Sequence, residues 1–258
     1  MTIRFDKYQG AGNDFVIVDG RDNVLDPGDA GLVRRLCDRR FGVGADGLIL
    51  ILPSGRADYE MRYFNADGRL GSMCGNGGRC AAHCALRWRI AGPRQRFLAY
   101  DGLHEAEVAG DTVRLRLSDV RGCRTVEGHY FLDTGSPHLV VFASGIDGID
   151  VAAEGRKWRW SPLFAPGGTN VNFVETTPEG LYIRTFERGV EEETWACGTG
   201  VTASAIASAL RAHAAGGPVD VRTRGGRLRV DFEIRGDLVT NVWLAGPAAF
   251  VFTGSIEA

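Results

Sequence analysis

The chain has 258 residues, of which 44% are hydrophobic and 24% charged, and its formal net charge is −2. This composition is typical of a soluble globular protein with a proper core. The near-neutral charge gives no electrostatic reason to expect nucleic acid or an anionic membrane as a partner. The charged start MTIRFDKYQG predicts no signal peptide, and the apolar run LILIL at 48–52 is far too short to span a membrane. Six cysteines in such a chain indicate reduced thiols and a cytoplasmic location.

Most of the chain predicts strands joined by tight turns. In chain order the extended segments are 15–22, 47–55, 59–68, 96–117, 129–142, 170–176, 181–189 and 219–246. Within them, Gly110-Asp111 in VAGDTVRLRL predicts a hairpin turn. Helices are few, and are expected at 29–39, 75–90 and 198–214. The chain is therefore expected to be an α+β protein.

The last two of these helices share the way they begin. Each follows a cysteine in a C-G-x-G turn, which is CGNG at 74–77 and CGTG at 197–200. Small apolar residues then cover nearly every face, and a helix that is apolar all round is normally buried. Upstream, MRYFNADG and IRTFERG also correspond, because Arg62 matches Arg184 and Phe64 matches Phe186 at an offset of 122.

This repetition predicts a duplicated fold with two pseudo-symmetric β-rich domains, each wrapped round a central buried helix. We expect the domains to cover residues 1–118 and 119–247, with the join near SDVRG at 118–122.

The cysteine positions have a specific chemistry. A helix N-terminus presents N–H groups that have no partner within the helix, together with the positive end of the helix dipole. An anion is stabilised there, and a thiol there is more readily ionised to its reactive thiolate. If the two halves face each other, the N–H groups would hold a carboxylate between two thiols. One thiolate would remove the α-proton while the other thiol returns a proton to the opposite face, without a cofactor.

Eight motifs, which run in order along nearly the whole chain, resemble those of the diaminopimelate epimerase family. They are GAGNDFVIVD (10–19), RRFGVGADGLIL (39–50), FNADG (64–68), MCGNGGRC (73–80), GSPHLV (135–140), GTNVNFV (168–174), ERGVEEETWACGTG (187–200) and VWLAGPAAFVFTG (242–254). The resemblance implies two similar domains, with the C-terminal strand at 248–258 returned to the first. It also implies a cofactor-independent epimerase that converts LL- to meso-diaminopimelate for lysine and peptidoglycan synthesis, and homodimers are common in the family.

The resemblance also implies roles for particular residues. Cys74 and Cys197 match the two catalytic cysteines, and Glu187 and His138 match polar residues beside them. The helix-end residues that bind the reacting carboxylate are matched by Gly75, Asn76, Gly77, Gly198 and Thr199. The residues that hold the distal end of the substrate are matched by Asn13, Asn65, Asn170 and Arg188, with Glu187 also bordering the substrate.

One position departs from the family pattern. Ser136 stands where many members have Asn, in the segment otherwise written G-N-P-H. Because that Asn serves the distal end of the substrate, the change bears on which amino acid is bound and not on the type of reaction.

Structural roles compete with these assignments. Asn13, Asn65 and Asn170 could form turns, and Glu187–Arg188 could be a solvated ion pair. His138 could cap a loop, and Thr199, Asn76 and the glycines could shape helix caps. The resemblance is what favours the functional roles.

The cysteines have alternative roles as metal ligands, packing residues or disulfide partners. Cys74, Cys80, His83 and Cys84 could ligate zinc, but on the predicted helix Cys80 and Cys84 are one turn apart whereas His83 falls about 100° away from Cys84, so no metal is expected. Cys37, Cys80, Cys84 and Cys123 are expected to be small buried packing residues. If the two thiols face each other, a disulfide between Cys74 and Cys197 under oxidising conditions remains an alternative.

Rival cofactor motifs are weak. GVGADG at 42–47 fits G-x-G-x-x-G, but a strand and not a helix is predicted to follow it. The only lysines, Lys7 and Lys157, end no phosphate-binding loop and give no reason to expect a pyridoxal phosphate Schiff base. Two alternatives to the diaminopimelate enzyme remain, namely an epimerase or racemase for histidine or hydroxyproline and a non-catalytic thiol or metal-binding protein.

Overall fold

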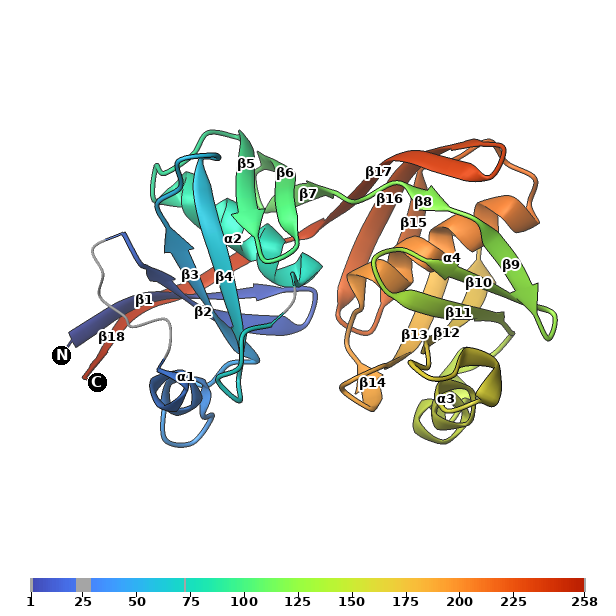
Figure 1. The fold of residues 1–258 in the computed structure, drawn as a ribbon, viewed down its shortest axis with the longest axis horizontal. Helices are drawn as coiled ribbons and strands as arrows, with labels where there is room; N and C mark the ends of the chain where they lie inside the picture. Colours follow the sequence, from blue (N-terminus) through green and yellow to red (C-terminus); the bar gives the residue numbers. More distant parts are fainter. Residues whose placement is uncertain (1, 22–28, 72, 258) are drawn as a thin grey trace. The chain divides into compact units, whose positions relative to one another are not determined.

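The computed structural model of the protein describes residues 2–21, 29–71 and 73–257. The ends of two predicted segments, at Asp22 and Ala258, lie outside the described residues. The chain divides into two compact units (Figure 1). Unit 1 comprises Met1–Leu115 and Gly246–Ala258, and unit 2 comprises Arg116–Ala245.

Unit 1 is built mainly of strands. Its elements are β1 Thr2–Gly10, β2 Asn13–Asp19, α1 Ala30–Cys37, β3 Gly47–Leu52, β4 Tyr59–Asn65, α2 Gly75–Arg87, β5 Arg94–Ala99, β6 Gly102–Ala109, β7 Thr112–Arg116 and β18 Ala249–Glu257. The strand β18 pairs antiparallel with β1, from Thr2 opposite Glu257 to Gln9 opposite Ala249. The predicted hairpin is confirmed, because Ala109 pairs with Thr112 across Gly110-Asp111.

Unit 2 has the same character. Its elements are β8 Val120–Arg121, β9 Cys123–Val126, β10 His129–Asp133, β11 Pro137–Phe142, η1 Ile146–Gly148, α3 Val151–Arg159, η2 Pro162–Phe164, β12 Asn170–Thr177, β13 Gly180–Glu187, β14 Glu192–Thr194, α4 Gly198–Arg211, β15 Val219–Thr223, β16 Gly226–Arg235 and β17 Leu238–Pro247.

The two units share one strand topology. In unit 1, β2 runs parallel to β3, β3 antiparallel to β4, and β4 parallel to β5. In unit 2, β11, β12, β13 and β15 repeat this order of parallel, antiparallel and parallel pairs. The registers agree as well, since Arg62 lies opposite Leu50 and Arg184 opposite Phe173. The predicted α+β class and pseudo-symmetric duplication are confirmed.

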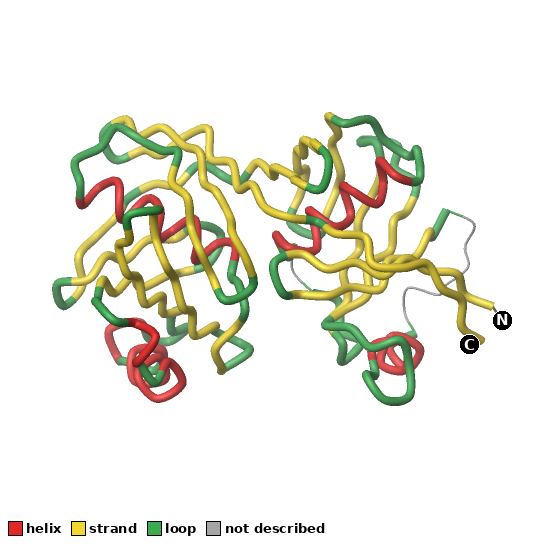
Figure 2. The backbone as a smooth tube through the Cα atoms, turned by 180° about the vertical axis from the view of Figure 1, so that it is seen from behind, coloured by secondary structure: helices red, strands yellow, loops and turns green. Residues whose placement is uncertain are grey.

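Each unit has a central helix with strands around it (Figure 2). The middle of α2 carries small buried residues, including Cys80, Ala81 and Cys84, which belong to a core cluster with Tyr59 and Phe97. In α4 the residues from Gly200 to Ala207 are all buried. Small side chains let the strands approach the helix closely on every side. This enclosure explains why small apolar residues cover nearly every face of the helix in the sequence.

The structure corrects some expectations. The helix α3 and the strand β1 were not predicted, although Asp150 caps α3 by accepting a hydrogen bond from the Ala153 amide at 3.0 Å. Cys123 is exposed, so its expected packing role is wrong, because β9 is a short strand with most of its residues in contact with solvent. Cys37, Cys80 and Cys84 are buried as expected.

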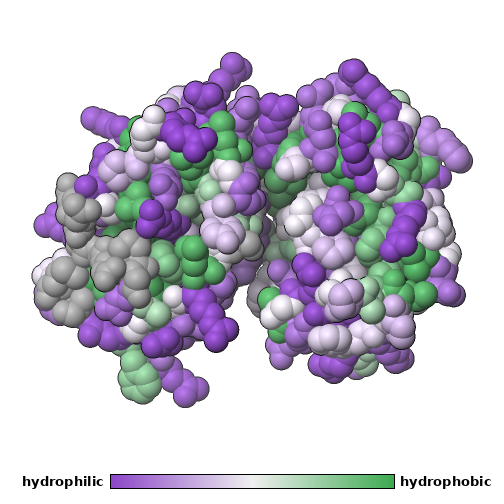
Figure 3. All heavy atoms as spheres, in the orientation of Figure 1, coloured by the Kyte–Doolittle hydropathy of each residue, from purple (hydrophilic) through white to green (hydrophobic). Residues whose placement is uncertain are grey.

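The surface has a mixed character. On the face drawn in Figure 3, hydrophilic and hydrophobic residues are interspersed over both units. Across the described part of the chain, no helix combines the length and the apolarity needed to cross a membrane.

Candidate active site

Cys74 immediately precedes α2 and caps its N-terminus. Its backbone is extended, with φ −101° and ψ 119°, and its carbonyl accepts the first helical hydrogen bond from the Gly78 amide at 2.7 Å. The side chain is partly exposed, whereas Asn76 and Gly77 in the first turn are buried. The predicted residues Gly75, Asn76 and Gly77 therefore form the first turn of a helix whose positive end faces the thiol-bearing residue.

Cys197 has the equivalent position in unit 2. Its φ of −113° and ψ of 111° are close to those of Cys74, and its carbonyl accepts a hydrogen bond from the Val201 amide at 2.8 Å. Cys197 is buried, with 9% of its surface exposed, and its Sγ lies 3.4 Å from Thr199 Oγ1. Each unit thus presents one thiol at the start of its central helix, as the sequence predicts.

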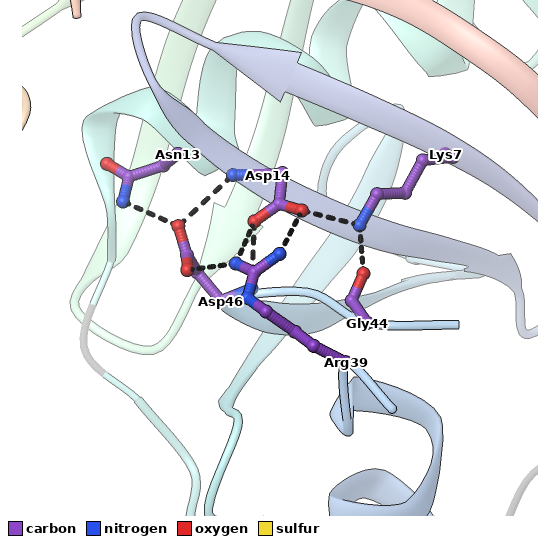
Figure 4. Close-up of polar contacts among 6 residues, drawn as sticks. All are labelled: Lys7, Asn13, Asp14, Arg39, Gly44 and Asp46. Carbon is purple, nitrogen blue, oxygen red and sulfur yellow. Dashed lines mark hydrogen bonds and ion pairs between the residues drawn. The ribbon is translucent and has the colours of Figure 1, made fainter. Parts of the chain in front are cut away.

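Asn13 and Asn76 are held together in unit 1. The side-chain amide of Asn76 donates to Asn13 Oδ1 at 2.6 Å, and that of Asn13 donates to Asp46 Oδ2 at 2.9 Å. Figure 4 shows Asn13 and Asp46 beside Asp14 and Arg39. The loop GVGADG, which fits G-x-G-x-x-G but is followed by a strand and not a helix, leads into strand β3 and supplies Asp46 to hold Asn13.

Behind Asn13 lies a set of charged side chains from separate elements (Figure 4). Arg39 donates to both carboxylate oxygens of Asp14, at 3.0 and 2.7 Å, and to Asp46 at 2.7 Å. Lys7, which is 8% exposed, bonds to Asp14 Oδ2 at 2.7 Å and to the Gly44 carbonyl. Burial alone would raise the pKa of Asp14, but the hydrogen bonds from Arg39 and Lys7 lower that pKa to about 2.

Arg79 is a buried cation at the start of α2. Its side chain is inaccessible to solvent, and its guanidinium donates to Asn76 Oδ1 at 2.8 Å and to the Pro247 carbonyl at 3.3 Å. Burial lowers the pKa of Arg79, whereas the nearby thiols of Cys80 and Cys74 oppose that shift. Sequence reasoning missed this residue, although its spacing of three from Asn76 places both on one helix face.

His138 lies directly beneath the first turn of α4. It is fully buried, and its Nε2 is 2.9 Å from Thr199 Oγ1 while its Nδ1 is 3.1 Å from Asn172 Nδ2. Burial, followed by the charge of Arg188, lowers the pKa of His138 to about 3, so the ring is neutral at physiological pH. Glu187 ends β13, and burial raises its pKa.

Asn170, Ser136 and Arg188 form a second polar cluster in unit 2. Asn170 donates to Ser136 Oγ at 2.9 Å, and its own Oδ1 accepts the backbone N–H of Arg188 at 2.8 Å. The Arg188 guanidinium is 3.4 Å from Ser136 Oγ. The departure from the family pattern at Ser136 therefore lies in direct contact with two predicted substrate-binding residues.

Asn65 differs from the other predicted residues. It is exposed at the end of β4, where its backbone closes a turn by accepting from the Gly68 amide at 2.8 Å. Asn65 therefore has the structural role of a turn residue, and it is exposed to solvent.

The residues considered as an alternative zinc site have other surroundings. Cys80 and Cys84 are buried in α2, and His83 Nδ1 is 3.1 Å from the Tyr8 hydroxyl. Within residues 2–21, 29–71 and 73–257, no group of three or more His, Cys, Asp or Glu side chains is arranged to hold a metal ion.

Comparison with known proteins places this arrangement in a family. The family model described as diaminopimelate epimerase matches residues 5–117 and 130–251. Proteins named diaminopimelate epimerase from Flavobacterium psychrophilum and Chlorobaculum tepidum are each 44% identical to the chain. The first alignment covers 97% of this chain and 98% of the relative, and the second 96% and 98%.

A solved structure extends the likeness to the fold. The phenazine biosynthesis protein of the PhzF family from Bacillus anthracis matches over 100% of both chains with a TM-score of 0.77. At 17% sequence identity that likeness concerns the fold alone. The sequence matches, by contrast, cover nearly the whole chain at high identity, and the chain belongs to the diaminopimelate epimerase family.

Proposed function

We propose that this protein interconverts LL- and meso-diaminopimelate by inverting one α-carbon, and that Cys74 and Cys197 are the two acid–base groups. Membership of the family supports the reaction and the substrate. The observation that carries the assignment of the thiols is their equivalence: each cysteine caps the central helix of its unit with nearly the same backbone conformation.

The reaction needs two groups of this kind. One cysteine, as its thiolate, takes the α-hydrogen as a proton and leaves the electron pair on the α-carbon. The other, as its thiol, then donates a proton to the opposite face of that carbon. Charge and atoms balance, because the first cysteine ends as a thiol and the second as a thiolate. No oxidation or reduction takes place. The two thiols therefore have to reach one α-carbon from opposite faces, which is a requirement of the proposal.

Helix N-termini suit the charge that develops during transfer. As the proton leaves, negative charge spreads from the α-carbon to the adjoining carboxylate. Backbone N–H groups of Asn76 and Gly77 in α2, and of Gly198 and Thr199 in α4, are the donors that we assign to that carboxylate. Preorganised backbone donors cost no rearrangement at the moment of reaction.

The distal amino-acid end of the substrate would be held by side chains. We assign Arg188 to its carboxylate, since a guanidinium can donate two parallel hydrogen bonds to a carboxylate. Asn170 orients Arg188 through the backbone bond described above, and Asn13 and Asn65 supply further polar contacts. Glu187 and His138 adjoin the reacting end.

The cellular setting belongs to the same proposal. An epimerase of this kind supplies meso-diaminopimelate for lysine and peptidoglycan synthesis, and we propose that it works in the cytoplasm as a homodimer. No cofactor is needed for the steps above, because each step is a proton transfer.

Hydrogen exchange at the α-carbon tests the proposal. The protein is incubated in D₂O under reducing conditions with LL-diaminopimelate, and deuterium incorporation and meso product are followed by NMR and chiral chromatography. We expect both with the native protein. Cys74→Ala and Cys197→Ala should each abolish epimerisation while circular dichroism stays native, and full turnover by either variant would rule out the two-thiol mechanism.

The same experiment addresses the alternative substrate. Ser136 contacts both Asn170 and Arg188, so a change there alters the proposed distal site directly. L-histidine and L-hydroxyproline are therefore tested in parallel. Exchange in either of these, without exchange in diaminopimelate, would keep the chemistry and replace the substrate. Absence of exchange in all three, with both thiols titrating as reduced, would support a non-catalytic protein.

A further inference from the structure

Four side chains in unit 2 form a continuous line of hydrogen bonds that ends at Cys197. Asn172 Nδ2 lies 3.1 Å from His138 Nδ1, and His138 Nε2 lies 2.9 Å from Thr199 Oγ1. Thr199 Oγ1 in turn lies 3.4 Å from Cys197 Sγ. Asn172 and His138 have no exposed surface, so solvent does not compete for these bonds.

The direction of this line is fixed at the Asn172 end. The Asn172 amide donates to the Leu139 carbonyl at 3.1 Å, and a carbonyl can only accept. The hydroxyl of Thr185 bonds to Asn172 Oδ1 at 3.0 Å. The Leu139 carbonyl therefore fixes which side of the amide carries nitrogen, and the Thr185 hydroxyl is compatible with that orientation. The two hydrogens of the nitrogen point to the Leu139 carbonyl and to His138 Nδ1.

The tautomer of His138 follows from this amide. Because Nδ1 accepts a hydrogen bond, it carries no hydrogen, and the single hydrogen of a neutral ring lies on Nε2. Nε2 then donates to Thr199 Oγ1. A hydroxyl has one hydrogen, so with its oxygen accepting from His138, the hydrogen of Thr199 is directed to Cys197 Sγ.

Unit 1 lacks this line at the equivalent place. The register that sets His138 opposite Asn170 sets Phe15 opposite Gly47, so Phe15 is the counterpart of His138 and Ile49 that of Asn172. The glycines confirm the match. A Cβ on Gly200 would contact Asn172 and His138, whereas one on Gly77 would contact Ile49 and Phe15. The first turn of α4 therefore rests on a polar pair and that of α2 on an apolar pair.

We propose that Asn172 is a positioning residue for the reaction: it holds His138 in the Nε2–H tautomer, which makes the Thr199 hydroxyl a hydrogen-bond donor to the Cys197 thiolate. The hydrogen bond from Thr199 then stabilises the thiolate form of Cys197 in the resting protein. The catalytic consequence rests on the proposed function. The direction of the hydrogen bonds does not, and it can be tested without substrate.

The tautomer can be measured directly. The native protein is labelled with ¹⁵N-histidine, and the ring nitrogens of its five histidines are observed by long-range ¹H–¹⁵N correlation, with His138 assigned from a His138→Gln variant. We expect Nδ1 of His138 to show the chemical shift of an unprotonated nitrogen and Nε2 that of a protonated one. A protonated Nδ1, alone or together with Nε2, would overturn the proposal.

Alkylation of Cys197 tests the effect on the thiol. Its rate with iodoacetamide is measured against pH by peptide mass spectrometry in the native protein, in Asn172→Leu and in Thr199→Val. Leu has nearly the shape of Asn but cannot donate to Nδ1, and Val lacks the hydroxyl. We expect each change to raise the pH midpoint by about one to two units, which is the effect of one hydrogen bond to a charged group.

The double variant and a control complete the test. Asn172→Leu with Thr199→Val should shift the midpoint no further than Thr199→Val alone, because both act through one hydroxyl. Thr202→Val removes another hydroxyl from α4, one that bonds to the Gly198 carbonyl, and should leave the midpoint unchanged. Additive shifts, or an Asn172→Leu variant that lowers only the melting temperature, would assign Asn172 a purely structural role. If Asn172→Leu does not fold, the tautomer measurement decides the matter alone.

Discussion

The two cysteines occupy matching backbone positions in surroundings of different polarity. Cys197 is buried near a neutral histidine and a threonine hydroxyl, whereas Cys74 is partly exposed and has the buried Arg79 in the next turn of its helix. A reaction that runs in both directions uses each thiol as base and as acid in turn. The residues around them therefore decide which protonation state each thiol holds before substrate binds.

The buried imidazole of His138 predicts a pH dependence of stability. Its pKa falls from 6.5 to about 3 on folding, so between these values the unfolded chain binds a proton that the native protein does not. Stability contributed by the neutral ring is complete above pH 6.5 and is lost as the pH falls. Between pH 7 and pH 5, we expect the free energy of unfolding to fall by about 2 kcal/mol more in the native protein than in His138→Gln. Urea unfolding at both pH values measures this, and equal losses would contradict it.

Replacement of Arg188 by lysine is expected to weaken substrate binding. In Arg188→Lys the charge is kept, but an ammonium cannot donate two parallel bonds to a carboxylate. We expect the dissociation constant for diaminopimelate to rise by on the order of tenfold or more. Arg69→Lys, a change at an exposed arginine, is the control, and isothermal titration calorimetry measures both. Unchanged affinity would remove Arg188 from the site.

At the level of elements, the sequence predicted the starts of α2 and α4 at the residue where the structure has them. The C-G-x-G turns made this possible, because a glycine-rich turn followed by small apolar residues is a local signal. The polar network behind Asn13 could not be predicted in this way. Asp46 and Asn13 are 33 residues apart, and their contact arises from the parallel pairing of β2 with β3.

The helix α3 was missed for a related reason. Its sequence VAAEGRKWR is short, polar and interrupted by Gly155, so its helical period is weak. Packing overrides that weakness, since a Cβ on Gly155 would lie 2.4 Å from the Phe186 side chain. Asn172 was missed as well, because nothing near it in the sequence shows that it meets His138 across two parallel strands.

The glycines of the two helix starts predict unequal responses to alanine. In a helix, Gly to Ala normally stabilises by roughly 1 kcal/mol. At Gly200 the added Cβ would lie 2.3 Å from Asn172 Oδ1, an atom anchored by hydrogen bonds, whereas at Gly77 the nearest atom is Ile49 Cδ1 at 3.3 Å. We expect Gly200→Ala to lower the melting temperature and the turnover, and Gly77→Ala to be the milder change. Thermal unfolding and kinetics compare them, and the reverse order would contradict the packing described.

At the level of the whole molecule, the units share one topology, and β18 completes unit 1. The strand pairs with β1 along its length, and the Phe252 ring meets that of Phe5 edge-on at 5.9 Å. The sequence predicted the duplication from an offset repeat of a few residues. The domain boundaries, 1–118 with the strand 248–258 and 119–247, stay a prediction.

Removal of β18 should therefore act on one unit. Deleting residues 249–257 leaves one edge of β1 without its partner and exposes apolar residues such as Ile3 and Phe5. We expect hydrogen exchange measured by mass spectrometry to speed up in β1 and β2 while β11–β13 keep their protection. Val251→Thr, a change at an exposed residue of the same strand, is the control. Equal loss of protection in both units would show that they unfold as one.

The pairing of β1 with β18 also sets an order of events during synthesis. Unit 2 is one continuous stretch of chain, Arg116–Ala245, and every residue of it is translated before β18. On the ribosome, unit 2 can therefore reach its native fold first, while β1 has been made but still lacks a neighbour along one edge. Until the last strand emerges, that edge is open to pairing with other nascent chains, so the growing polypeptide is most prone to aggregate in the part that was made first.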